Sequence, residues 1–140
     1  MKKLFAFAVL STVFFTHSAC SQSPENSSVS KQKPTIAKDI DVKEFALKAK
    51  SGEYFLLDVR TPEEYAEAHL GGSTLMNIYD NNFEQQLETL DKNVPVLVYC
   101  RSGGRSGKAM QMMREKGFSE VYNLEGGITT WIQEGEKVEK

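Results

Sequence analysis

The 140-residue sequence has little of what several protein classes require. It contains two cysteines, Cys20 and Cys100, in segments of different character, whereas a disulfide framework in a small exported domain uses several paired cysteines. Each thiol therefore needs its own explanation. His69 is the only histidine after His17, so a cluster of histidine metal ligands cannot be assembled. We predict neither a metal site nor another cofactor.

A concentrated positive charge is also missing. The chain carries 17 Lys and Arg against 19 Asp and Glu, and the basic residues are scattered. Binding to nucleic-acid phosphates needs a basic face, so the composition argues against a nucleic-acid partner. The hydrophobic share of 40% is ordinary for a globular chain, and the length leaves room for one domain and a short leader.

No apolar run near the start reaches the ~20 residues that a transmembrane helix needs. The run at 4–15 is shorter, follows Lys2 and Lys3, and is followed by the small pair Ser18-Ala19. This order of a charged start, an apolar stretch and small residues is typical of a signal peptide. We therefore predict that residues 1–20 direct export.

The end of this leader bears on Cys20. Ser18-Ala19-Cys20 resembles the end of a bacterial lipobox, which implies a lipidated Cys20 and a membrane-anchored protein facing the periplasm or the cell surface. His17 departs from the aliphatic residue usual three positions before the cysteine, so a soluble periplasmic or secreted protein is the alternative. Residues 21–35 are rich in Ser, Asn, Gln and Lys, which predicts a flexible linker.

Residues 36–140 alternate short apolar runs with helical patterns, which predicts one α/β domain. The candidate strands are 54–59, 75–78, 96–99 and 121–124. The first and third are almost continuously apolar, as strands buried on both faces of a parallel sheet are.

The helices between these strands carry start and stop signals. Asp41, Thr61 and Asn82 are placed to begin helices, while Gly52 and Gly117 are placed to end them. The remaining apolar side chains of the C-terminal half are interpreted as core: Met110, Met112, Met113, Ile128, Trp131 and Ile132.

The loop after the strand at 96–99 carries the chemistry. It reads Cys100, Arg101, Ser102, Gly103, Gly104, Arg105, Ser106. The two glycines allow the backbone to curl with several N–H groups pointing inward, and a helix predicted from Arg105 to Lys116 adds the positive end of its dipole. These donors and two arginines favour a thiolate, so Cys100 is predicted to be a nucleophile. An inert buried cysteine is the alternative, but ligands in α/β proteins bind at this end of a strand.

Three segments together resemble one family. CRSGGRS resembles the active loop of the rhodaneses, also called thiosulfate sulfurtransferases; DVRTPEEYAEAHLGGS resembles their first signature, and GFSEVYNLEGGITTW their closing strand, glycine pair and helix. The resemblance covers about Ile36 to Trp131. It implies a doubly wound sheet of about five parallel strands with helices on both faces.

The resemblance also implies a mechanism. Cys100 would take sulfur from thiosulfate or a similar anion as a persulfide and pass it to cyanide or a thiol acceptor. The amides from Arg101 to Arg105 would cradle the persulfide, with Arg105 anchoring the loop and Arg101 steering anions. Asp58 and Arg60 match the family's Asp-Val-Arg and would brace the surroundings of the loop. The segment 71–76 is about two residues longer than is usual in the family, so its path is not predicted.

Two other functions stay open. Phosphatases and arsenate reductases have a similar Cys-to-Arg loop, but typically with five residues between the two, where Cys100 and Arg105 leave four. A domain that only binds persulfides or docks to a redox partner is the second alternative. An exported thiolate lives among oxidants, so a thiol reductase or a sulfur-carrier protein is an expected partner.

Overall fold

The computed structural model describes residues 35–140. The predicted signal peptide, Cys20 and all but the last residue of the predicted linker lie outside the described residues. Within residues 35–140, none of the helices combines the length and the apolar character needed to cross a membrane.

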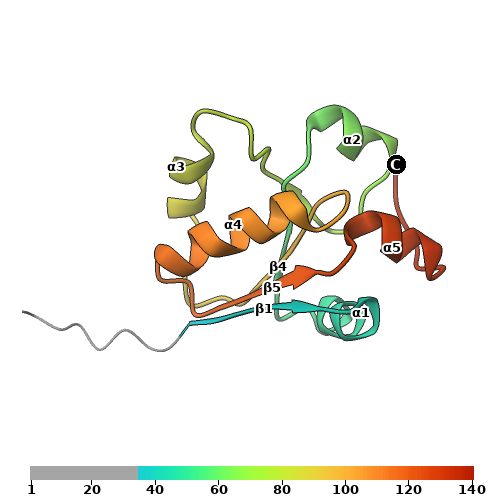
Figure 1. Ribbon diagram of the computed structural model, residues 1–140, viewed down its shortest axis with the longest axis horizontal. Helices are drawn as coiled ribbons and strands as arrows, with labels where there is room; N and C mark the ends of the chain where they lie inside the picture. The colour runs from blue at the N-terminus through green and yellow to red at the C-terminus, as the bar shows by residue number, and fades with distance from the viewer. Residues whose placement is uncertain (1–34) are drawn as a thin grey trace, which may run out of the picture. The chain divides into compact units, whose positions relative to one another are not determined.

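Strands and helices alternate along the described residues and form a three-layer α/β domain (Figure 1). The elements are β1 (Ile36–Ile40), α1 (Val42–Ser51), β2 (Phe55–Asp58), α2 (Pro62–Glu67), β3 (Thr74–Leu75), α3 (Phe83–Glu88), β4 (Val96–Tyr99), α4 (Gly104–Glu115), β5 (Glu120–Leu124) and α5 (Gly127–Gln133). The strands pair in parallel in the order β1-β5-β4-β2-β3. This confirms the predicted fold, a five-stranded parallel sheet with helices on both faces.

Most of the predicted helix signals act as expected. The carboxylate of Asp41 accepts a hydrogen bond from the Glu44 amide in the first turn of α1, and Thr61 forms a complete capping box with Glu64 at the start of α2. Gly52 ends α1 and Gly117 follows α4, with φ angles of 74° and 84° that favour glycine. Local sequence therefore fixes where these helices begin and end.

Two strands differ from the prediction. The sequence pattern missed β1 because it is an edge strand whose side chains are largely exposed, with only Ile40 fully buried. The predicted strand at 75–78 is reduced to Thr74–Leu75, since the chain beyond it leaves the sheet. Met76 and Ile78 still donate backbone hydrogen bonds to the end of β2, at 2.9 and 3.3 Å.

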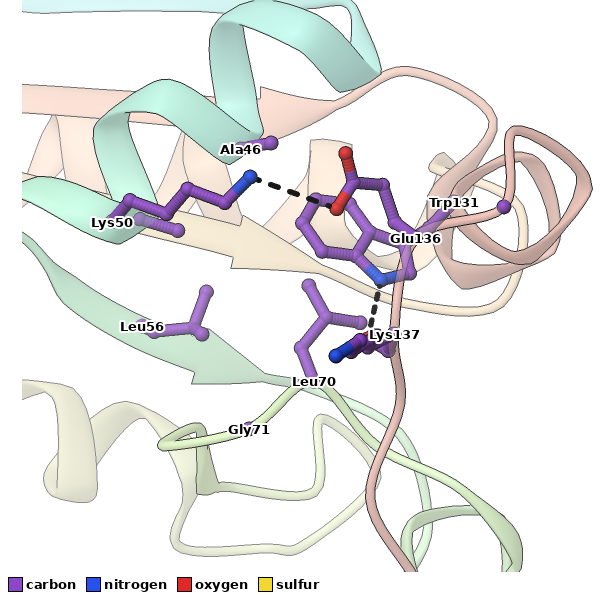
Figure 2. A pocket seen from close by; sticks show the side chains of 10 residues that line it. Ala46, Lys50, Leu56, Leu70, Gly71, Trp131, Glu136 and Lys137 are labelled. Carbon is purple, nitrogen blue, oxygen red and sulfur yellow. Dashed lines mark hydrogen bonds and ion pairs between the residues drawn. The ribbon is translucent and has the colours of Figure 1, made fainter.

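The long segment after α2 follows a defined path. His69 pairs with Glu139 in an antiparallel bridge, with N–H···O distances of 2.9 and 2.8 Å, so the C-terminal residues run alongside this segment. Leu70 is buried, and its amide donates to the Tyr99 hydroxyl at 3.1 Å. Leu70 and Gly71 line one side of a cavity of about 490 Å³ that also contacts α1 and Trp131 (Figure 2). None of the residues that line this cavity belongs to the Cys100 loop.

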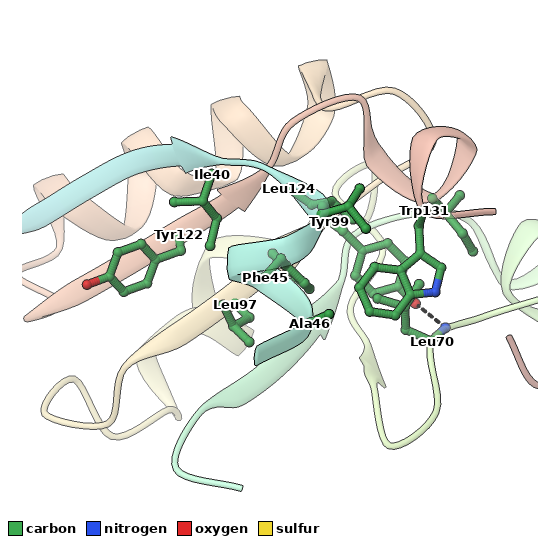
Figure 3. Packing of buried hydrophobic residues seen from close by; sticks show 11 residues of the cluster. Ile40, Phe45, Ala46, Leu70, Leu97, Tyr99, Tyr122, Leu124 and Trp131 are labelled. Atoms are coloured by element: carbon green, nitrogen blue, oxygen red, sulfur yellow. Dashed lines mark hydrogen bonds between the residues drawn. The ribbon is translucent and has the colours of Figure 1, made fainter. Parts of the chain in front are cut away.

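Two hydrophobic clusters lie on opposite faces of the sheet, because alternate residues of β4 point to opposite sides. Val96 and Val98 face α3 and α4, whereas Leu97 and Tyr99 face α1 and α5. Figure 3 shows the second cluster, in which the α1 side chain Phe45 lies near Trp131. Their ring centroids are 6.0 Å apart in an edge-on arrangement.

The predicted core near the C-terminus needs one correction. Ile128 and Trp131 are buried, but Ile132 is 50% exposed. Ile132 lies about 100° of helix rotation beyond Trp131, which places it on the solvent side of α5. In α4, Met113 is fully buried, while Met110 and Met112 pack at the margin of the core.

Candidate active site

Cys100 follows the last residue of β4 and lies at the carboxyl end of the sheet. Its side chain is a free thiol, and the residue is only 1% exposed. The sulfur accepts a hydrogen bond from the Gly103 amide at 3.1 Å and from the Ser106 hydroxyl at 3.3 Å. Gly103 is the N-cap residue of α4 and adopts a φ of 94°, so the helix N-terminus opens toward the sulfur.

These donors decide the protonation of the thiol. Burial by itself would raise the pKa of Cys100, because it disfavours the charged form. The Ser106 hydroxyl and the amides of Ser106, Ser102 and Gly103 act in the opposite direction and outweigh burial, so the pKa lies below that of an ordinary thiol. The loop therefore favours the nucleophilic thiolate.

The carbonyl oxygen of Gly103 accepts hydrogen bonds from both the loop and a neighbouring strand. It accepts from the Gly107 amide at 2.9 Å, from the Ser106 hydroxyl at 3.2 Å and from Nδ2 of Asn123 at 3.2 Å. Asn123 lies on β5 and is 4% exposed, and the same Nδ2 also donates to Asp39 on β1 at 2.7 Å. Asn123 was not predicted from the sequence as a site residue, although it is a polar amide inside the otherwise apolar run at 121–124.

The N-terminus of α5 supports the loop through hydrogen bonds to the loop backbone. Ile128 donates its amide to the Cys100 carbonyl at 2.9 Å, and Thr129 donates its amide and hydroxyl to the Arg101 carbonyl at 3.2 and 2.9 Å. Gly127 makes this close approach possible, because its φ is 61° and a side chain there would collide with the Cys100 and Arg101 backbone. Sequence reasoning noted the glycine pair but not this contact.

Arg105 is held by a residue of α2. Its two terminal nitrogens donate to the two carboxylate oxygens of Glu64, each at 2.7 Å. The bidentate pair lowers the pKa of Glu64 to about 2 and raises the pKa of Arg105 above its ordinary value. The guanidinium also lies over the ring of Tyr79, 5.8 Å from its centroid. This partner gives Arg105 a fixed position at the start of α4.

Arg101 and Ser102 are exposed, and so is Gly104. Arg101 borders a cleft of about 250 Å³, which is also lined by Glu67, Thr129 and Ile132. Of the predicted loop residues, the structure places Ser102, Gly103 and Ser106 against the sulfur. Arg101 and Gly104 face solvent, and the Arg105 side chain is directed to Glu64.

Asp58 and Arg60 form a buried ion pair behind this site. Nη2 of Arg60 lies 2.6 Å from Oδ2 of Asp58 and donates to the Ala68 carbonyl at 2.7 Å. The guanidinium also lies 5.5 Å from the ring centroid of Tyr99, whose hydroxyl holds Leu70. The pair thus joins the end of β2 to the segment after α2, and its hydrogen bonds do not extend to the Cys100 sulfur.

Among the described residues, no three His, Cys, Asp or Glu side chains cluster as metal ligands. The groups gathered at the site are a thiol, backbone amides, a hydroxyl and two arginines.

Comparison with known proteins gives the class of this domain. The model of the rhodanese-like domain family matches residues 41–134, so the chain belongs to that family. Thiosulfate sulfurtransferase GlpE of Coxiella burnetii is 37% identical over 82 residues, which cover 59% of this chain and 75% of that protein. The protein YqhL of Bacillus subtilis is 38% identical over 76 residues, but the match spans only 59% of its length and 54% of this chain.

Solved structures agree with this assignment. A rhodanese-related protein from Thermoplasma volcanium superposes with a TM-score of 0.65 at 28% identity, covering 73% of this chain and 97% of that structure. A rhodanese-like domain protein from Staphylococcus aureus gives a TM-score of 0.60 at 29% identity, covering 74% and 99%.

Proposed function

We propose that the protein is a sulfurtransferase that moves sulfane sulfur from thiosulfate or a related anion to cyanide or a thiol through a persulfide on Cys100. The observation that carries this proposal is the set of donors around the buried sulfur, above all the Gly103 amide at 3.1 Å and the Ser106 hydroxyl at 3.3 Å. They stabilise a thiolate, which is the attacking form of cysteine.

The proposed reaction has two displacements at sulfur. The Cys100 thiolate attacks the outer sulfur of thiosulfate, the sulfur–sulfur bond of the donor breaks, and sulfite leaves with the electron pair. The outer sulfur then carries negative charge as a persulfide. The amides of Ser102, Gly103 and Ser106, which surround the Cys100 sulfur, would stabilise that charge. Cyanide or a thiolate attacks this outer sulfur and departs as thiocyanate or a new persulfide, and the Cys100 thiolate is restored.

The pairing of Arg105 favours sulfur transfer over phosphoryl or arsenate chemistry. An enzyme that attacks a tetrahedral oxyanion directs donors, such as backbone amides and arginines, at the oxygens around the central atom. Here each terminal nitrogen of Arg105 already donates to Glu64, whose carboxylate also offsets the charge of the guanidinium. The short loop, with four residues between Cys100 and Arg105, points the same way.

We further propose that the protein works outside the cytoplasm. The support is the sequence of residues 1–20, which ends at the lipobox-like Cys20 and is followed by a polar linker. A membrane anchor through Cys20 would hold the domain near a membrane, and a thiol reductase or sulfur-carrier protein would accept the sulfur.

Thiocyanate formation from thiosulfate and cyanide tests the catalytic proposal. Wild type should turn over, and Cys100→Ser should lose the activity because an alcohol is a far poorer nucleophile at neutral pH. Cys20→Ser is the matched control, because it replaces the other thiol of the chain and should leave turnover intact. A wild type that forms a persulfide but never releases thiocyanate would favour the persulfide-binding alternative, and activity retained by Cys100→Ser would exclude Cys100 as the carrier.

Aryl-phosphate hydrolysis tests the competing enzyme class in the same samples. We expect no phosphatase turnover by the wild type. A variant with one glycine inserted between Gly103 and Gly104 should lose sulfur transfer, since misplacement of about 1 Å can reduce a rate ~100-fold. Robust phosphate release by the wild type would contradict the proposal.

A further inference from the structure

The Ser106 hydroxyl faces two acceptors but has one proton to donate. Its oxygen lies 3.3 Å from the Cys100 sulfur and 3.2 Å from the Gly103 carbonyl oxygen. Only donation to the sulfur stabilises the thiolate. The reactivity of Cys100 therefore depends on what keeps the Ser106 proton away from the Gly103 carbonyl.

A carbonyl oxygen has two lone pairs, and two other donors already occupy that of Gly103. The Gly107 amide donates at 2.9 Å within the first turn of α4, and Nδ2 of Asn123 donates at 3.2 Å from β5. With both positions filled, the hydroxyl of Ser106 finds its remaining acceptor at the sulfur.

We infer that Asn123 is a positioning residue that occupies the Gly103 carbonyl and thereby directs the Ser106 proton to the sulfur of Cys100. Asn123 does not contact the sulfur and acts only through Ser106 and Gly103. The inference deepens the proposed function, because it concerns the nucleophile on which that function rests.

Asp39 holds the amide of Asn123 in the required orientation. Its Oδ1 accepts from Nδ2 of Asn123 at 2.7 Å, so both protons of that nitrogen are used. If the amide were rotated by half a turn, Oδ1 of Asn123 would face two oxygen acceptors. In the observed orientation Oδ1 is buried with no partner among the described residues. A buried acceptor left unpaired destabilises the fold. The observed orientation is kept despite this loss, because the two hydrogen bonds from Nδ2 hold it.

The inference predicts a particular pattern of coupling. Without the Asn123 amide, the Gly103 carbonyl has a free lone pair, and the hydroxyl of Ser106 turns to it. The sulfur then loses the same hydrogen bond that it loses when Ser106 is replaced by Ala. The two substitutions should consequently share one effect, whereas unrelated effects on stability would add.

The test is the pH dependence of Cys100 alkylation by iodoacetamide, measured on the reduced full-length protein without any sulfur donor. Mass spectrometry of the Cys100 peptide separates this thiol from Cys20. The charged groups on the neighbouring elements are Asp39, Asp58, Arg60, Glu64, Arg101 and Arg105. The variants Asn123→Leu and Ser106→Ala leave all of them unchanged. A difference in midpoint between these proteins therefore reports hydrogen bonding.

We expect Asn123→Leu and Ser106→Ala each to move the alkylation midpoint to higher pH and to slow alkylation at pH 7 roughly three- to tenfold. The alkylation rate of the double variant should be at most about twofold lower than that of Ser106→Ala alone. An unchanged midpoint in Asn123→Leu, or a full additional effect in the double variant, would overturn the inference.

Asp39→Ala gives an independent test in an exposed residue, which applies even if Asn123→Leu fails to fold. Loss of the Asp39 charge alone would lower the alkylation midpoint of Cys100. We expect Asp39→Ala to raise it, because the amide of Asn123 loses its orientation. This rise should occur only when Ser106 is present. Asp91→Ala is the matched control, because Asp91 also accepts from an asparagine amide, that of Asn93 at 3.1 Å, at the opposite end of β4. A lower or unchanged midpoint in Asp39→Ala would contradict the inference. If the midpoints move as expected but thiosulfate forms no persulfide, the proposed function fails and the inference stands.

Discussion

Arg105 and Glu64 are 41 positions apart in the sequence, and both carboxylate oxygens of Glu64 accept hydrogen bonds of 2.7 Å from Arg105. Glu64 also completes the capping box of α2 with Thr61. One side chain thus fixes the start of α2 and ties it to the start of α4. The pair explains how a short glycine-containing loop keeps one conformation around the sulfur.

Glu64→Gln should separate the two roles of this side chain, since glutamine can complete a capping box but cannot form the ion pair. We expect the free energy of unfolding to fall by about 1–3 kcal/mol at neutral pH, because Arg105 loses its charged partner in a site that is largely shielded from solvent. Urea unfolding measures the change. Glu63→Gln is the control on the same helix, and an equal loss there would argue against a specific role of the pair.

The same pair predicts a pH dependence. The pKa of Glu64 is lowered from its ordinary 4.5 to about 2 by Arg105, so the pair stabilises the fold fully above the ordinary pKa. Its contribution is lost as the pH falls from about 5 toward 2. The difference in unfolding free energy between wild type and Glu64→Gln should shrink over this interval. A difference that stays constant down to pH 2 would show that the ionised carboxylate is not responsible.

Asp58→Asn should be strongly destabilising. The substitution leaves Arg60 buried without its counter-charge, which typically costs about 3–5 kcal/mol. Thermal or urea unfolding measures it, with the exposed Asp91→Asn as the matched control. Because the pair donates no hydrogen bond to the sulfur, the alkylation midpoint of Cys100 should not rise in whatever fraction of Asp58→Asn remains folded; loss of the negative charge alone can only lower it. A higher midpoint would contradict a purely bracing role.

Gly127→Ala and Gly135→Ala form a matched pair. Both glycines have positive φ, 61° and 84°, so alanine costs about 1–2 kcal/mol of backbone strain at either position. Only Gly127 faces backbone atoms, those of Cys100 and Arg101, whereas the space at Gly135 is open. We expect Gly127→Ala to lose about 1–3 kcal/mol more and to disturb the loop. Equal melting temperatures for the two variants would show that α5 does not support the loop as described.

Export can be tested in cells. Wild type should fractionate with membranes as a lipidated protein, and Cys20→Ser should appear in the soluble fraction without lipid, because Cys20 is the residue that the lipobox-like sequence would modify. One acyl chain anchors only marginally, so more than one is expected in the intact mass. The same soluble, unlipidated mass for both proteins would refute the anchor.

The features that the sequence predicted well have local causes. The run at 96–99 is apolar throughout, and the run at 55–58 is apolar up to Asp58, because these strands lie inside the sheet with helices on both faces. The start of α2 is specified by the adjacent residues Thr61 and Pro62. The loop at Cys100 was identifiable for the same reason, since its donors and glycines are consecutive.

The features that were missed depend on distant partners. β1 is an exposed edge strand, so its residues show little apolar pattern. From the sequence, Asn123 is a residue of a strand, and nothing near it indicates its contact with Gly103. Glu64 lies in the first turn of a helix, and nothing near it indicates its contact with Arg105. Only the fold, which places β5 and α2 against the loop, gives them these contacts.

The most direct test of the account is the intact mass of the purified protein before and after incubation with thiosulfate, followed by cyanide. The account predicts that thiosulfate adds the mass of one sulfur atom, that fragmentation places it on Cys100, and that cyanide removes it. Cys100→Ser should gain nothing. A wild-type protein that takes up no sulfur, or takes it up equally in Cys100→Ser, would contradict the central claim that Cys100 is the sulfur carrier.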